Sequence, residues 1–244
     1  MLPYIHIIVP FYGVFVALGV MVSFLFFTKR SSMLSIDRLK KIQIAASASI
    51  GVLIGSRIVF VLTMLPVMMK DFSLQQVVRI SLGGGFVFYG GLLGAIGALY
   101  LYGKVRKINT DDLLQTAAPC FPLFHAFGRI GCFMAGCCYG IPCSVGFPLA
   151  VEPDVIRFPV QLVEAFACIV LSVLLLVAEK LFPRARLLTV YLVSYAVIRF
   201  GLEFLRGDVV RGFFGCFSTS QWISLAILVF YLRQAVMYRR RQKE

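Results

Sequence analysis

Seven long apolar stretches dominate this sequence, and each is long enough to cross a lipid bilayer. They cover approximately residues 8–28, 42–66, 85–103, 112–135, 160–180, 188–206 and 220–237. A helix of about 20 mainly apolar residues spans the hydrocarbon core. With 60% hydrophobic and 14% charged residues, the chain has too little polar surface for a soluble protein. The sequence therefore predicts an all-α, polytopic membrane protein: seven transmembrane helices in a single domain over residues 1–244, with small outer loops.

The lysines and arginines flank these stretches unevenly, and this bias predicts the orientation of the chain. Sixteen of the 24 lie in the segments on one side of the membrane and five in the segments on the other. Because cytoplasmic loops are enriched in Lys and Arg, we expect the N-terminus outside and the C-terminus in the cytoplasm. The net charge of +13 is spread along the ends of apolar runs instead of forming one patch, so nucleic acid is not expected as a partner.

Three regions interrupt the apolar pattern. The outer segments 67–84 and 136–159 contain the runs SLGGGF and YGIPCSVGFP, whose Gly and Pro content is typical of turns. We expect short outer elements there. Pro119 and Pro122 crowd the start of the fourth stretch and make its boundaries the least certain.

Three arginines, Arg57, Arg129 and Arg199, lie inside the apolar stretches. A charge at the bilayer centre costs from about 2.5 to more than 10 kcal/mol, so each needs a partner or a water-filled cavity. On the predicted topology, several polar residues of other helices share their outward depth: Tyr12, Tyr89, Gln161, Glu164 and Glu203. The matched depth predicts a polar cavity open to the outer leaflet.

The stretch YAVIRFGLEFLRGD contains polar residues at helical spacing. Tyr195, Arg199 and Glu203 lie four residues apart and therefore share one helical face, where Glu203 can partly neutralise Arg199. The arginines could reach out to the headgroup region, or tie helices together through carboxylates. Alternatively, Arg129 and Arg199 together suit a phosphate, which the guanidinium fork binds bidentately. A phospholipid headgroup is the anion available at that depth.

Four of the seven cysteines, Cys132, Cys137, Cys138 and Cys143, fall within twelve residues near the outer face. No histidine accompanies them at ligand spacing and no CxxC pair is present, so we expect no metal site. A disulfide among the last three remains an alternative in an oxidising exterior. His125 precedes Arg129 by one helical turn and is interpreted as a packing residue.

A glycine-rich helix is predicted from the run FVFYGGLLGAIGALY. Gly90 and Gly94 form a small-xxx-small pattern, which favours close packing of helices. Gly90 and Gly91 lie at the helix mouth, where the lack of side chains would also let a lipid headgroup approach the backbone.

These motifs together resemble the phosphatidylglycerol–prolipoprotein diacylglyceryl transferase family, in order and over nearly the whole chain. PFYGVFVALG resembles the first helix of that family, and YGGLLGAIGALY its glycine-containing helix. GRIGCFMAGCCYG resembles the family signature, FPVQLVEAF the segment that follows it, and YAVIRFGLEFLR the last signature. Seven spans with the N-terminus outside are also similar to the family.

The resemblance implies an enzyme of the bacterial cell membrane. Such a transferase moves the diacylglyceryl group of phosphatidylglycerol to the lipobox cysteine thiol of a prolipoprotein signal peptide and releases glycerol phosphate, without a cofactor. It implies catalytic roles for Arg129, Arg199 and Tyr89. It also implies substrate-binding roles for the following residues: Tyr12, Gly90, Gly91, Cys132, Gly140, Tyr195, Glu203 and Arg206.

Three positions depart from the family pattern. Tyr89 stands where the family usually has a histidine, Cys132 where it has the signature asparagine, and Cys137 where it has the signature glutamate. These changes keep the phosphate-binding arginines and alter the groups that would activate the thiol. Two alternatives follow: a lipid-binding enzyme of the same fold with another acceptor or headgroup, or a non-enzymatic membrane transporter or assembly partner.

Overall fold

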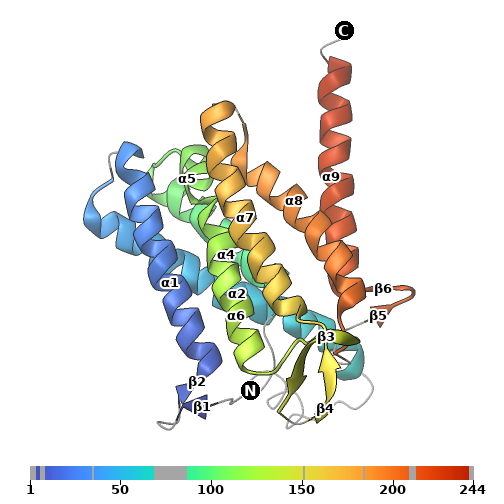
Figure 1. The fold of residues 1–244 in the computed structure, drawn as a ribbon. Coiled ribbons are helices and arrows are strands. Elements are labelled where there is room, and N and C mark those ends of the chain that lie inside the picture. Colours follow the sequence, from blue (N-terminus) through green and yellow to red (C-terminus); the bar gives the residue numbers. More distant parts are fainter. Residues whose placement is uncertain are drawn as a thin grey trace. The chain divides into compact units, whose positions relative to one another are not determined.

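The computed structural model is built almost entirely from helices (Figure 1). It describes residues 4–5, 9–34, 36–68, 87–150, 152–183, 185–208 and 213–241. By length and composition, five of the described helices can cross a membrane: α1 (Phe11–Arg30), α2 (Arg38–Met68), α7 (Val160–Leu181), α8 (Leu187–Leu202, continued by η2, Glu203–Leu205) and α9 (Thr219–Arg241). The chain is thus a multi-pass membrane protein. Seven spans and the orientation of the termini stay predictions, and so does the single-domain organisation.

The chain divides into two compact units. One contains residues 1–27 and 117–244, and the other residues 28–116. In the second unit, η1 (Ser31–Leu34) connects to α2, which packs along α4 (Phe88–Arg106), and α5 (Thr110–Ala117) follows.

Glycines explain the close contact between α2 and α4. A Cβ atom added at Gly55 would collide with the carbonyl oxygen of Gly90, and one added at Gly94 would collide with that of Gly51. The small-xxx-small prediction for Gly90 and Gly94 is therefore confirmed as a packing contact. Gly97 has open space where its side chain would be.

In the first unit, α6 (Cys120–Met134), α7, α8 and α9 pack each on the next (Figure 1). The start of α1 contacts α6 through glycine, because a Cβ atom at Gly131 would lie 3.3 Å from the ring of Tyr12. Most of the buried side chains of this unit are apolar, but several charged side chains are buried together at one end of α6, α7 and α8.

The fourth predicted span, 112–135, is wrong as one continuous helix. The structure breaks it into α5, which ends at Ala117, and α6, which begins at Cys120. Two prolines account for the break, because Pro119 and Pro122 lack the N–H groups that a continuous helix would use. Pro119 occupies the N-cap position of α6.

The all-α prediction needs a smaller correction. In the described part of the chain, three short antiparallel hairpins accompany the helices: β1 (Tyr4–Ile5) with β2 (Val9–Pro10), β3 (Pro142–Leu149) with β4 (Glu152–Arg157), and β5 (Phe213–Phe214) with β6 (Phe217–Ser218). The hairpin β3–β4 lies within the segment 136–159, where a short outer element was expected. The SLGGGF turn, the greater part of the segment 67–84, and Lys70, Arg79, Arg184, Arg211 and Lys243 lie outside the described residues.

Candidate active site

A buried carboxylate, Glu164, lies at the centre of the charged cluster. It sits in the second turn of α7 and has no exposed surface. Its Oε2 atom accepts hydrogen bonds from Nη2 of Arg129 on α6 and from Nη1 of Arg199 on α8, the latter at 3.1 Å. One carboxylate oxygen therefore ties three helices together through the two arginines that the sequence placed inside apolar stretches.

The other oxygen of Glu164 faces neutral partners. The hydroxyl of Tyr195 donates a hydrogen bond to Oε1 at 2.9 Å, and Nε2 of His125 lies 3.5 Å from the same atom. The opposite ring nitrogen of His125 is 3.4 Å from the sulfur of Cys168. His125 also meets the Tyr195 ring edge-on, with centroids 5.0 Å apart. These contacts fix the orientation of the carboxylate in a buried surrounding, where hydrogen bonds and charge pairing are stronger than in water.

A second set of ion pairs continues from Arg199 towards the end of α8. Nη2 of Arg199 is 2.5 Å from Oε2 of Glu203, and Arg206 lies 4.0 Å from the same carboxylate. Nε and Nη2 of Arg206 donate hydrogen bonds to the two carboxylate oxygens of Asp208, at 2.9 and 2.7 Å. Burial works against the charge of Arg206, but the hydrogen bonds to Asp208 outweigh it and raise the pKa of Arg206 above its ordinary value.

One N–H donor of the cluster, on Arg129, makes no hydrogen bond to the described residues. Nε of Arg129 is buried and has no hydrogen-bond partner among the described residues. A buried N–H group without a partner costs roughly 1–3 kcal/mol, and more when it is charged. Such a group is a ready donor for an anion, because an acceptor that enters the site recovers that cost.

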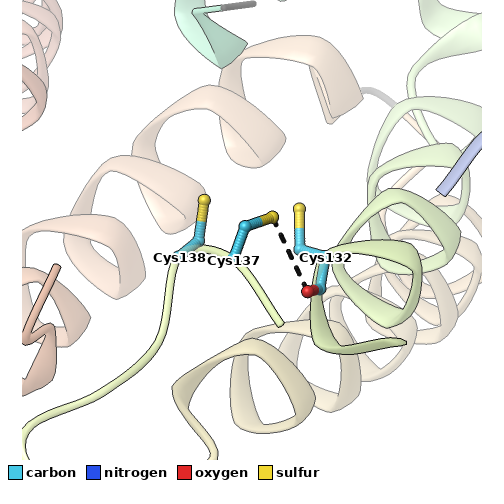
Figure 2. A group of neighbouring side chains, drawn as sticks. All are labelled: Cys132, Cys137 and Cys138. Carbon is cyan, nitrogen blue, oxygen red and sulfur yellow. Dashed lines mark hydrogen bonds between the residues drawn. The ribbon is translucent and has the colours of Figure 1, made fainter. Parts of the chain in front are cut away.

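Three of the cysteines lie close together at the end of α6 and in the loop that follows it. Figure 2 shows Cys132 in the last turn of the helix and Cys137 and Cys138 in the loop, with their sulfur atoms on the same side. The three sulfurs all lie within 4.8 Å of one another. Two positive φ angles make this possible, 68° at Gly136 and 56° at Cys138, of which only the glycine takes such a value readily.

The same loop is fixed to the end of α8 by a close approach of two backbones. Gly140 pairs with Arg206, and the Ile141 N–H donates to the Leu205 carbonyl at 3.0 Å. A Cβ atom at Gly140 would collide with the carbonyl of Phe158. Gly140 is therefore required for packing, which joins the cysteine loop to the charged cluster.

Comparison with known proteins decides which family this geometry belongs to. A model of the prolipoprotein diacylglyceryl transferase family matches residues 2–237. The chain belongs to this family. It is similar to a phosphatidylglycerol–prolipoprotein diacylglyceryl transferase of Clostridium tetani, with 32% identity over 89% of this chain and 88% of the relative. A second such enzyme, from Clostridium perfringens, is 31% identical over 89% and 86%, and one from Dehalococcoides mccartyi is 30% identical over 98% and 92%.

Membership of the prolipoprotein diacylglyceryl transferase family confirms the resemblance read from the motifs. The residue assignments made from that resemblance divide between the two units. The first unit contains Tyr12, Arg129, Cys132, Gly140, Tyr195, Arg199, Glu203 and Arg206. Five of them form one connected cluster with Glu164: Arg129, Tyr195, Arg199, Glu203 and Arg206.

Tyr89, Gly90 and Gly91 belong to the second unit. All three are buried. Gly90 packs against Gly55, and a Cβ atom at Gly91 would touch Val52 at 3.2 Å. Contact with α2 is thus sufficient to explain both glycines, and the substrate-binding roles given to them in this family stay predictions, as does the catalytic role of Tyr89.

Two residues, Glu164 and His125, make more contacts in the charged cluster than the sequence indicated. Glu164 was noted only as one polar group at matched depth, and His125 was interpreted as a packing residue. A usable signal existed for Glu164, because a lone carboxylate inside an apolar helix must be paired, and the buried arginines were the partners available. The role of His125 depends on a contact between α6 and α7 that its position in the sequence does not reveal.

Proposed function

We propose that this chain transfers the diacylglyceryl group of phosphatidylglycerol to the lipobox cysteine thiol of prolipoproteins and releases glycerol phosphate. The observation that carries the proposal is the buried cluster in which Arg129 and Arg199 share the carboxylate of Glu164, in a chain that matches the family over nearly its full length. The names of the relatives supply the two substrates, and the cluster supplies a reason for the chemistry.

The arginines act on the phosphate of the lipid. In the reaction the acceptor sulfur bonds to the glycerol carbon, the bond from that carbon to the phosphate oxygen breaks, and the electron pair leaves with the oxygen. Positive groups fixed near that oxygen stabilise the charge that develops there. Arg129 has the free donor for this contact, since its Nε is buried and unpaired among the described residues.

Glu164 acts through the arginines as a positioning residue. It holds both guanidinium groups from one oxygen, and the Nε donor of Arg129 stays without a partner among the described residues. A preorganised pair of this kind needs no reorganisation during the reaction, which is the main source of electrostatic catalysis. Glu203 and Asp208 hold Arg199 and Arg206 in the same way.

The remaining assignments complete the proposal. Arg129, Arg199 and Tyr89 are the catalytic residues. The substrate-binding residues are the following: Tyr12, Gly90, Gly91, Cys132, Gly140, Tyr195, Glu203 and Arg206. The protein works in the bacterial plasma membrane with seven spans, takes lipid from the outer leaflet, and has its C-terminus in the cytoplasm. Cysteine-accessibility labelling of the loops 29–41 and 104–111 tests this topology, because labelling of both from outside would contradict it.

The function is tested with the purified protein in vesicles of labelled phosphatidylglycerol and a synthetic lipobox peptide. We expect mass spectrometry to show a diacylglyceryl thioether on the peptide, and an equal amount of glycerol phosphate in solution. A peptide with serine in place of the cysteine is the control and should remain unmodified. Consumption of lipid without a thioether would indicate another acceptor, and intact lipid under all conditions would exclude an enzyme of this class.

A further inference from the structure

The sulfurs of Cys132, Cys137 and Cys138 form a cluster (Figure 2). The proposed function gives Cys132 a substrate contact and assigns no chemistry to Cys137 or Cys138. These cysteines are close in the chain, yet the convergence of their sulfurs depends on the left-handed backbone at Gly136 and Cys138. A cysteine in that conformation is strained, and strain of this kind persists where the surroundings impose it.

The surroundings fix the loop from three directions. The Cys137 N–H donates to the Cys132 carbonyl at 3.1 Å, which folds the loop back onto α6. The Gln161 side chain of α7 donates to the Cys137 carbonyl at 2.8 Å. Arg157 of β4 donates to the Gly140 carbonyl at 3.4 Å and stacks on the Tyr139 ring, 4.5 Å from its centroid. The three thiols are therefore presented on a supported backbone.

The geometry of the three thiols suits a zinc ion. Zinc binds thiolate sulfur at about 2.3 Å in a tetrahedral arrangement, which places neighbouring sulfurs about 3.8 Å apart. The present separations, within 4.8 Å, reach that value by small side-chain rotations. No fourth Cys, His, Asp or Glu of the described residues joins the group, and Cys137 is exposed. Three protein ligands with one open position are the pattern of a catalytic zinc site.

The charges around the cluster also favour a thiolate site. Three thiolates around Zn²⁺ have a net charge of about −1. The guanidinium groups of Arg129 and Arg206 both attract negative charge on Cys138. Both arginines would therefore partly compensate the charge of the site. Arg129 is also one of the two arginines that the proposed function places on the lipid phosphate, so the open position would lie near the proposed reaction centre.

We propose that Cys132, Cys137 and Cys138 bind one zinc ion, whose fourth position takes the thiol of the acceptor cysteine and delivers it as a thiolate. This rests on the proposed function. It answers a need of that function, because Tyr89 stands where the family usually has a histidine, and a phenol is chemically a poorer general base than an imidazole. A thiol that coordinates zinc is deprotonated outright.

The step balances without an oxidant. The acceptor S–H loses its proton to solvent as the sulfur binds zinc. The zinc-bound thiolate then attacks the glycerol carbon, the carbon–sulfur bond forms, and the carbon–oxygen bond breaks. The electron pair leaves on the phosphate oxygen near Arg129, and the thioether product, a weaker ligand, leaves the metal. The proposal reverses the expectation from spacing, which considered only CxxC pairs and nearby histidines.

Metal binding is tested first, on the full-length protein purified in detergent with a reductant and Zn²⁺. We expect about one zinc per chain, and at least a tenfold weaker affinity in Cys137→Ser and Cys138→Ser. Cys143→Ser and Cys216→Ser remove exposed thiols outside the cluster and should keep the zinc. Melting temperatures establish that each variant is folded. Zinc-free protein, copper in its place, a disulfide within the cluster, or unchanged zinc in both cluster variants would overturn the site.

The role of the fourth position is tested with Co²⁺ in place of zinc. Adding the lipobox peptide should strengthen the thiolate-to-cobalt charge-transfer band, whereas the serine peptide should leave it unchanged. Removing zinc with a chelator should abolish transfer, and adding it back should restore transfer. Full transfer by folded, zinc-free protein would refute this inference and leave the proposed function intact. A zinc protein that never transfers lipid would instead refute the proposed function, and the thiol-activating role with it.

Discussion

The contact between α2 and α4 and the contact among α6, α7 and α8 solve the same packing problem with opposite means. The first brings backbone against backbone at four glycines: Gly51, Gly55, Gly90 and Gly94. The second buries two arginines on the carboxylate of Glu164. Membrane helices associate well through small residues alone. Since α2 and α4 of this protein already pack through glycines, the buried charges of α6, α7 and α8 are better explained by a role in the reaction than by a role in packing.

The largest effect is expected from a variant that removes the central carboxylate, because the buried arginines then lose the charge that they share. Glu164→Gln leaves Arg129 and Arg199 without the charge that they share, and breaking a buried ion pair typically costs about 3–5 kcal/mol. We expect a large fall in melting temperature and loss of transfer. Glu152→Gln is the matched control: Glu152 is half-exposed and pairs with Arg157 at 2.5 Å, and a surface pair contributes roughly 0–1 kcal/mol.

A double variant tests whether the cluster only stabilises the packing of the helices or also takes part in lipid transfer. Replacing a buried pair by apolar side chains is often neutral or stabilising. In Glu164→Leu with Arg129→Met, Arg199 keeps Glu203 as its partner. We expect the melting temperature to recover relative to Glu164→Gln, while transfer stays absent. Recovery of both would show that the cluster only braces the helices.

The next effect concerns the guanidinium fork. Arg129→Lys and Arg199→Lys keep the charge but lose the planar pair of donors. A charge-assisted hydrogen bond contributes roughly 1.5–3 kcal/mol, so if it forms fully only in the transition state, transfer should fall about ten- to hundred-fold. The melting temperature should change much less. Arg233→Lys, exposed on α9, is the control. Full activity in both variants, or unfolding that accounts for the whole loss, would refute the role in phosphate binding.

The glycine contact gives the complementary test. In Gly94→Ala the added Cβ atom would collide with the Gly51 carbonyl, and overpacking of this kind typically costs about 1–3 kcal/mol. We expect a lower melting temperature, and a loss of transfer no greater than the loss of folded protein. Gly97→Ala lies one turn further along the same helix in open space and should leave the melting temperature unchanged or slightly raised. Equal melting temperatures for the two variants would contradict the close contact.

The sequence supplied the membrane class, most helix positions and the arginine pair, because apolar length and buried charge are local signals. It missed the break between α5 and α6, although Pro119 and Pro122 marked it. Two features could not be predicted: the contact of His125 with Glu164, which requires the packing of α6 on α7, and the convergence of Cys132 with Cys138, which requires a left-handed cysteine. The catalytic and substrate-binding roles stay predictions.

The smallest effect is expected at Tyr195, and it decides between two roles for that residue. The sequence assigned Tyr195 to substrate binding. In the structure its hydroxyl donates to Glu164 at 2.9 Å and only 1% of its surface is exposed, so its polar atom is already used inside the cluster.

Tyr195→Phe keeps the ring against His125 and removes one hydrogen bond to a carboxylate that retains both arginines. A hydrogen bond to a charged group contributes roughly 1.5–3 kcal/mol. Because both arginines still hold the carboxylate, we expect a loss at the lower end of that range, seen as a slightly lower melting temperature. If Tyr195 only positions Glu164, kcat should fall a few-fold and KM for lipid should stay unchanged, because the substrate loses no contact. Tyr102→Phe removes a comparable hydroxyl bond to Gln43, 2.9 Å long, far along the sequence and outside the cluster, and should lower neither kcat nor KM. A raised KM with an unchanged melting temperature would place Tyr195 on the substrate instead.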